Sequence, residues 1–200
     1  KKIKINIEFV SANPTGPLHV AHARGAVFGD VLSNMMESVG YNVVREYYIN
    51  DTGKQIQILG ESLFIRYKQQ LNKTKEIIKD GYYPGEYLID IAKELILNDG
   101  DKWISCNEKT REKFFKNYAI SKILNLIKAD LNNIGIYFDK FTSEKTIINK
   151  KIINLLFDKL KKRNLLYVGK LNKPKSDIDL DWEPRKQLLF KSSLFGDDTD

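Results

Sequence analysis

The first 50 residues follow a strand–loop–helix–strand pattern, and this pattern restricts the fold more than any other feature of the chain. Apolar and polar residues alternate over 3–9 with the period of two that is typical of a β-strand. A helical pattern begins between residues 18 and 22 and runs to residue 39, where Gly40 is placed to end it. Residues 41–49, rich in Val, Tyr and Ile, form a second predicted strand. This order predicts a βαβ unit with parallel strands.

The pattern changes along the rest of the chain. A further helix should run to about Gln70, with Asp51 or Thr52 as its N-cap. We predict an α/β protein in three regions. Residues 1–70 form the first half of a Rossmann-type (HUP-like) nucleotide-binding fold, and 71–163 form a mostly helical insertion. Residues 164–200 hold short strands and a loop that return to the nucleotide-binding fold, which is truncated there. The other candidate elements are helices at 85–97, 108–134 and 147–162, an extended piece at 136–141, and strands at 165–168 and 187–190.

Composition narrows the choice of partners. The 33 Lys and Arg exceed the 26 Asp and Glu by seven, which suits a polyanion such as nucleic acid. Scattered lysines are also ordinary solvated surface. The single cysteine, Cys106, excludes an intrachain disulfide and a Cys-based zinc site, and it fits a reducing compartment. There is no signal peptide and no apolar run near the roughly 20 residues of a membrane span, so we expect a cytoplasmic protein with no membrane partner.

The only two histidines, His19 and His22, lie three residues apart at the predicted start of the first helix. A helix N-terminus after a parallel strand presents unpaired N–H groups and partial positive charge, which suit a phosphate. Gly16 lets the backbone come close to a ligand, and Pro17 directs the chain into the helix. Two alternative roles are open for the histidines: they could be ordinary polar surface residues, or they could bind a metal ion as a pair. A metal would need a third ligand nearby, which the sequence does not supply, so we predict no protein-bound metal.

The residues around these histidines resemble a known family. Residues 12–22, ANPTGPLHVAH, resemble the His-Ile-Gly-His region of class I aminoacyl-tRNA synthetases, and residues 10–25 resemble arginyl-tRNA synthetases specifically. The resemblance covers essentially all 200 residues. In one departure, Ala21 stands where the family usually has Gly, a position that lies against the adenine, so one methyl group is added there. Further matching segments are 47–55, 83–87 with 90–92, 131–139, 182–185, 189–190 and 195–198.

The resemblance implies a ligase that attaches arginine to tRNA(Arg) through an arginyl-adenylate formed from ATP with Mg²⁺. It implies catalytic roles for His19 and His22. It also implies arginine contacts from Glu8, Ser11 and Asn13, and ATP contacts from Asn13, Gly16, His19, Ala21 and His22. Further possible site residues are Asn50, Asp51 and Gln55. We expect a monomer, and we expect this chain to be a fragment that is inactive alone.

Other readings stay open at this point. Glu8 could instead lie on the polar face of an edge strand. Asn13 could be a turn residue, and Asp51 could cap a helix. Gly25 is expected to permit close packing of the helix on the sheet. For the whole chain, the alternatives are a nucleotidylyltransferase of the His-x-x-His superfamily and a non-catalytic paralogue that binds nucleotide or tRNA.

Overall fold

The computed structural model describes residues 3–148, 150–170 and 185–198. The chain divides into two compact units, residues 1–147 and 148–200. Trp182 and the acidic loop around it lie outside the described residues. The described helices include none that is long and apolar enough to cross a membrane.

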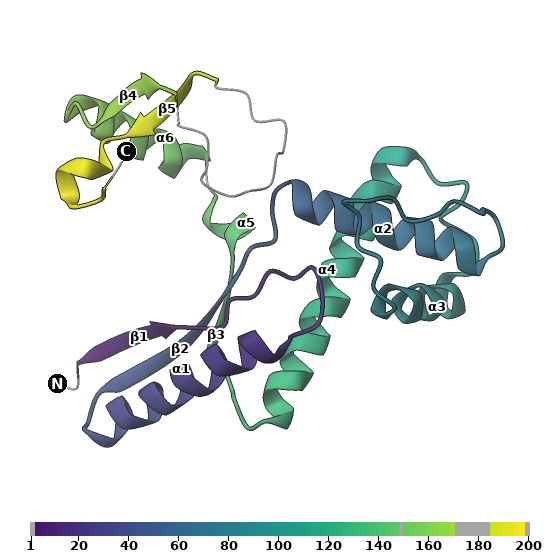
Figure 1. Ribbon diagram of the computed structural model, residues 1–200, viewed down its shortest axis with the longest axis horizontal. Helices are drawn as coiled ribbons and strands as arrows, with labels where there is room; N and C mark the ends of the chain where they lie inside the picture. The colour runs from purple at the N-terminus through teal and green to yellow at the C-terminus, as the bar shows by residue number, and fades with distance from the viewer. Residues whose placement is uncertain (1–2, 149, 171–184, 199–200) are drawn as a thin grey trace. The chain divides into compact units, whose positions relative to one another are not determined.

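The first unit contains a parallel sheet of three strands in the order β1-β2-β3 (Figure 1). These strands are β1 (Lys4–Glu8), β2 (Asn42–Ile49) and β3 (Lys140–Ser143). Helix α1 (Val20–Ser38) connects the parallel pair β1 and β2, so the predicted βαβ unit is confirmed. The extended piece predicted at 136–141 overlaps β3 only at residues 140 and 141, since β3 begins later, and β3 pairs with β2. The protein is therefore of the predicted α/β class.

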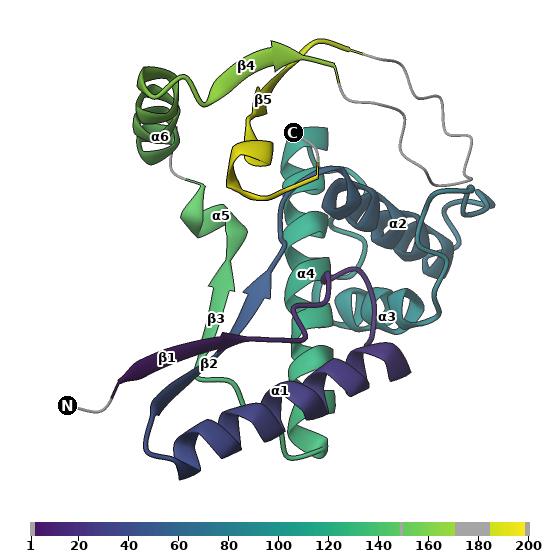
Figure 2. The ribbon, with the colours of Figure 1, turned by 60° about the vertical axis from the view of Figure 1, so that its left-hand side comes forward.

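Helix α1 runs along β1 and β2 (Figure 2), and its buried residues are all small: Ala26, Gly29 and Ser33. A Cβ atom at Gly29 would overlap the ring of Phe9, the residue that follows β1. Gly25, by contrast, has no other group within 4 Å of a Cβ placed on it. The expectation that Gly25 permits close packing was wrong, because Gly25 faces away from the sheet while Gly29 faces it.

The end of α1 matches the sequence prediction. Gly40 has φ +96°, a left-handed conformation that glycine adopts without steric penalty. Its N–H donates to the carbonyl of Glu37 at 3.0 Å, and the next N–H, of Tyr41, donates to that of Met36 at 3.1 Å. These two bonds are the Schellman pattern, which satisfies carbonyls that the helix end leaves unpaired.

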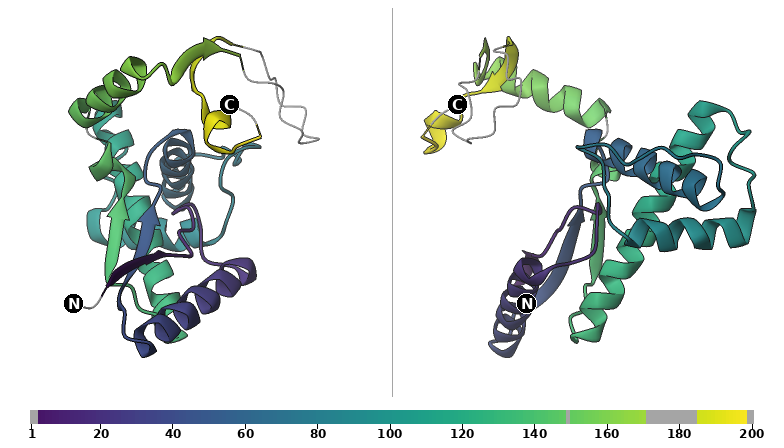
Figure 3. Two further views of the ribbon diagram at one scale, coloured as in Figure 1. Left: turned by 90° about the vertical axis from the view of Figure 1, so that its left-hand side faces the viewer. Right: turned by 45° about the vertical axis from the view of Figure 1, so that its right-hand side comes forward.

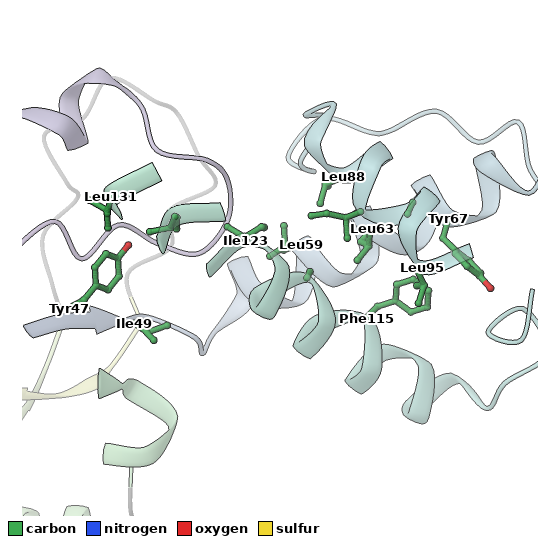
Figure 4. Close-up of a cluster of buried hydrophobic side chains, with 14 of the residues drawn as sticks. Tyr47, Ile49, Leu59, Leu63, Tyr67, Leu88, Leu95, Phe115, Ile123 and Leu131 are labelled. Atoms are coloured by element: carbon green, nitrogen blue, oxygen red, sulfur yellow. The ribbon is translucent and has the colours of Figure 1, made fainter. Parts of the chain in front are cut away.

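Three helices form a second layer of the first unit (Figure 3). They are α2 (Lys54–Gln70), α3 (Tyr87–Asp99) and α4 (Glu108–Asn133), close to the predicted bounds. Helix α4 is about 39 Å long at the usual helical rise. It joins the two layers into one core, because Leu131 near its end lies beside Tyr47 of β2, whereas Phe115 near its start lies beside Leu95 (Figure 4).

The second unit consists of α6 (Lys150–Lys162), the antiparallel pair β4 (Leu166–Gly169) and β5 (Gln187–Phe190), and a 3-10 helix over Ser192–Phe195. The helix predicted at 147–162 and the strands predicted at 165–168 and 187–190 are thus present. A short helix, α5 (Glu144–Ile147), ends the first unit. The domain boundaries at residues 70 and 163 stay a prediction.

Candidate functional site

The loop between β1 and α1 begins with strained backbone. Val10 and Ser11 have φ +63° and +40°, which a β-branched residue such as valine rarely adopts. The Ser11 side chain compensates by accepting a hydrogen bond from the backbone N–H of Tyr48 at 3.0 Å. The loop is thereby tied to β2 at the carboxyl ends of the parallel strands, where open α/β sheets bind their ligands.

Two predicted arginine-binding residues meet at this edge. The Ser11 hydroxyl donates a hydrogen bond to the carboxylate of Glu8, the last residue of β1. Glu8 is exposed to solvent. Its carboxylate is therefore oriented by a neighbour and accessible to a cationic ligand, a geometry that suits a guanidinium group.

Asn13 connects the first group of candidates with the second. Its exposed side-chain amide donates to the Gln55 side chain at 3.4 Å, a long hydrogen bond between the β1–α1 loop and the first turn of α2. Asn50, directly after β2, is half-buried.

Asp51 is engaged with a different element from the one predicted. Its carboxylate accepts hydrogen bonds from the Ser143 hydroxyl at 2.6 Å and from the backbone N–H of Lys145 at 3.1 Å. The N-cap residue of α2 is Gly53, with no side-chain cap. Neither Asp51 nor Thr52 caps α2, so that prediction was wrong. Asp51 caps α5 instead, since the return of β3 to the sheet brings α5 beside it.

The two histidine rings lie close together, tilted by 30° to each other, at the start of α1. His19 is the N-cap residue, and the centroids of the two rings lie 3.7 Å apart. The His22 ring atom Nδ1 accepts a hydrogen bond from the backbone N–H of His19 at 3.2 Å. His19 is exposed and His22 half-buried. Both rings therefore lie where the unpaired N–H groups of the helix begin.

The geometry also indicates which tautomer the neutral His22 ring adopts. Because Nδ1 accepts a hydrogen bond, the proton of the neutral ring resides on Nε2, which has no hydrogen-bond partner among the described residues. Burial lowers the pKa of His22, and the nearby His19 lowers that pKa further. A neutral imidazole with a fixed Nε2–H donor at a helix N-terminus is suited to a phosphate oxygen.

The two small residues of the predicted ATP site lie on either side of His19. A Cβ at Gly16 would lie 3.4 Å from the hydroxyl oxygen of Tyr87. Ala21 is exposed in the first turn of α1, so its extra methyl group faces solvent or a ligand and disturbs no packing.

Two tyrosines that the sequence analysis did not assign to the site also contact this loop. The hydroxyl of Tyr47 donates to the carbonyl of Ala12 at 2.9 Å, and that of Tyr87 donates to the carbonyl of Thr15 at 2.6 Å. Both tyrosines belong to segments with family resemblance, 47–55 and 83–87. That resemblance was their only signal, because the contacts span 35 and 72 residues of sequence.

A groove of the first unit lies away from this loop. A space of about 680 Å³ between α2 and α4 is lined by residues such as Gln57, Phe64 and Lys116, and by none of the predicted site residues. We assign the site to the β1–α1 loop because the strand ends, helix N-terminus and histidine pair meet there. In the described ranges, no cluster of three or more His, Cys, Asp or Glu side chains could hold a metal ion.

Comparison with known proteins identifies the family of the chain. The family described as class I tRNA synthetases (R), catalytic domain, matches residues 1–179. The arginine–tRNA ligase of Orientia tsutsugamushi (strain Ikeda) is 48% identical over 98% of this chain, and that of Anaplasma phagocytophilum is also 48% identical over 98%. The chain spans 33% and 34% of their lengths.

Solved structures show the same fold. A crystal structure from Campylobacter jejuni, described as that of a proposed arginyl-tRNA synthetase, superposes with a TM-score of 0.79 at 33% identity. It covers 100% of this chain and 40% of that one. The arginyl-tRNA synthetase of Thermus thermophilus has a TM-score of 0.53 at 19% identity over 88% of this chain and 29% of its own, and so supports the fold alone. The chain belongs to the family of class I arginyl-tRNA synthetase catalytic domains.

Proposed function

We propose that this chain is the ATP-binding part of an arginine–tRNA ligase and that it also contributes to arginine recognition. The observation that carries the proposal is the histidine pair, in which the Nδ1 atom of His22 accepts a hydrogen bond from the backbone N–H of His19, and its Nε2–H has no partner in the part of the chain that the structure describes. A preorganised donor of this kind stabilises charge that develops on a phosphoryl group.

In the proposed first step, an oxygen of the arginine carboxylate forms a bond to the α-phosphorus of ATP. The bond between that phosphorus and the bridging oxygen breaks, and pyrophosphate leaves with Mg²⁺. In the second step, a hydroxyl of the terminal ribose of tRNA(Arg) attacks the carbonyl carbon of the adenylate, and AMP leaves. Neither step needs a covalent enzyme intermediate, so His19 and His22 act by positioning and electrostatic stabilisation. Asn13, Gly16 and Ala21 would contact the nucleotide beside them.

Arginine selection is assigned to the Glu8 carboxylate. Its hydrogen bond from Ser11 holds it at the end of β1. A carboxylate and a guanidinium form two parallel hydrogen bonds, which the single ammonium of lysine does not reproduce. Asn13, held by Gln55, would supply a polar contact to the same substrate. Asn50 and Asp51 are assigned lesser parts, since Asp51 already binds two groups of the β3–α5 segment.

The proposed partners are arginine, tRNA(Arg) and ATP carried with Mg²⁺, in a cytoplasmic monomer. The net charge of +7 is consistent with a nucleic-acid partner. Mg²⁺ is assigned to the incoming ATP complex.

The test is amino-acid-dependent exchange of pyrophosphate into ATP by the full-length protein that carries this chain, with and without tRNA(Arg). Arginine should support exchange and lysine should not. A nucleotidylyltransferase would exchange pyrophosphate with no amino acid present, and a non-catalytic paralogue would bind ATP without exchange. Either result would replace the ligase assignment.

A further inference from the structure

Two tyrosine hydroxyls from separate elements hold the β1–α1 loop on either side of Asn13. Tyr47 extends from β2 and is fully buried, and its hydroxyl donates to the Ala12 carbonyl at 2.9 Å. Tyr87, the first residue of α3, is half-buried, and its hydroxyl donates to the Thr15 carbonyl at 2.6 Å. The loop lacks regular structure, so these carbonyls need donors from elsewhere in the fold.

The surroundings of Tyr87 restrict its ring to this position. A Cβ atom at Gly85 would overlap the Tyr87 ring, so only glycine leaves room for the ring there. The absence of a side chain at Gly16 keeps the loop backbone close to the Tyr87 hydroxyl. Burial raises the pKa of both Tyr47 and Tyr87 to about 12, so both hydroxyls remain protonated donors across the physiological range.

We infer that Tyr47 and Tyr87 are positioning residues for the two substrates, acting through different parts of the loop. Tyr47 holds Ala12, which lies between Ser11 and Asn13, the predicted arginine contacts. Tyr87 holds Thr15, on the path to Gly16 and His19, the predicted ATP contacts. Through Tyr87, the helical layer orients the ATP-binding turn, and through Tyr47, the sheet orients the arginine-binding end.

This inference rests on the proposed function, and it predicts a different kinetic defect for each tyrosine. Tyr87→Phe removes one hydroxyl and leaves the ring, and it should raise the KM for ATP on the order of tenfold, with the KM for arginine changed less than twofold. Tyr47→Phe should give the reverse pattern. Loss of folded protein would lower the apparent kcat and leave both KM values unchanged.

Tyr67→Phe is the matched control. Tyr67 is also buried, and its hydroxyl donates at 2.5 Å to a carbonyl that lies outside the β1–α1 loop, that of Gly100. Tyr67→Phe should lower the free energy of unfolding by about as much as Tyr47→Phe and Tyr87→Phe do, and it should leave both KM values unchanged. Gly85→Ala is a second variant, because it keeps the Tyr87 hydroxyl but displaces the ring. It should reproduce the Tyr87→Phe pattern.

The experiment measures arginine-dependent pyrophosphate exchange by these variants of the full-length protein, together with amide hydrogen exchange of peptides that cover residues 12–19. Exchange of these peptides should be roughly three- to tenfold faster in Tyr87→Phe and Tyr47→Phe, and unchanged in Tyr67→Phe. The inference is overturned if the two variants cannot be told apart from Tyr67→Phe, or from each other by their KM values.

The two proposals can fail separately. If the unmodified protein shows no arginine-dependent exchange, the ligase assignment fails, but the hydrogen-exchange comparison still tests whether the tyrosines hold the loop. If the unmodified protein is active and all three tyrosine variants have wild-type KM values and hydrogen exchange, only the positioning role is wrong.

Discussion

The His22 side chain folds back onto the residue that precedes its own helix. Its Nδ1 atom accepts a hydrogen bond from the backbone N–H of His19 at 3.2 Å, and the centroids of the two tilted rings lie 3.7 Å apart. This relationship places a neutral imidazole at the N-terminus of α1 with its Nε2–H directed away from the backbone contact. It leads directly to the first two predictions.

The first prediction concerns the titration of His22. Burial and the neighbouring His19 both lower its pKa from 6.5, so its titration midpoint should lie below pH 6.5. Because the pKa is lower in the folded state than in the unfolded state, the contribution of neutral His22 to stability is present above pH 6.5 and is lost as the pH falls below it. The chain has only two histidines, so NMR of their ring protons can follow both. In His19→Asn the His22 midpoint should rise but stay below 6.5, because burial is the larger cause. A midpoint at or above 6.5 in the unmodified chain would contradict the geometry.

The second prediction separates the two nitrogens of His22. Asparagine can replace the Nδ1 acceptor and keep the contact with the His19 N–H, but it lacks a donor at the Nε2 position. Glutamine extends an amide N–H to about that position. His22→Asn should slow adenylate formation by roughly 10²–10³-fold, the effect of losing a preorganised donor, and His22→Gln should slow it much less. Single-turnover formation of arginyl-adenylate by the full-length protein measures both. Equal rates in the two variants would remove the donor role from Nε2.

The third prediction concerns arginine recognition by Glu8. Glu8→Gln keeps the shape of the side chain but removes the charge that would pair with the guanidinium. A hydrogen bond to a charged group contributes about 1.5–3 kcal/mol, so the KM for arginine should rise roughly 10- to 100-fold while the KM for ATP changes little. Steady-state pyrophosphate exchange measures both constants.

The matched control is Glu46→Gln. Glu46 lies opposite Glu8 in the β1–β2 register, but its carboxylate is held by Asn6, Thr142 and Lys140, which lower its pKa to about 2. Those partners leave it unavailable to substrate, so the variant should keep the wild-type KM for arginine. Equal defects in the two variants would return Glu8 to the role of an ordinary strand residue.

The fourth prediction compares two glycines of α1. Gly29→Ala would force a methyl group into the Phe9 ring and should destabilise the chain by about 1–3 kcal/mol, as overpacked cores do. Gly25→Ala meets open space and should stabilise the helix by about 0.5–1 kcal/mol, because alanine loses less backbone entropy than glycine. Urea unfolding of the 200-residue chain measures both changes. A loss of stability in Gly25→Ala as large as that in Gly29→Ala would show that the two faces of α1 are not distinguished in this way.

The sequence alone was sufficient for features that depend on near neighbours. The alternation over residues 3–9, the helical periods and the position of Gly40 were enough to predict β1, α1 and its end, because side-chain periodicity and glycine conformation are local properties. The histidine pair was also predictable, since a spacing of three residues at a helix start brings both rings together through local geometry alone. The family resemblance supplied the candidate binding residues, and their roles in binding remain predictions.

Only the tertiary structure decided which distant groups meet. Asp51 caps α5 rather than α2 because the Ser143 and Lys145 groups return beside it after more than 90 residues. The contact from Tyr87 to Thr15 spans 72 residues. Position 29 must be glycine because a Cβ atom there would overlap the ring of Phe9, which follows β1. These partners depend on how β3, α3 and α1 pack, and packing is set by the shapes of surfaces that adjoin only after the chain has folded.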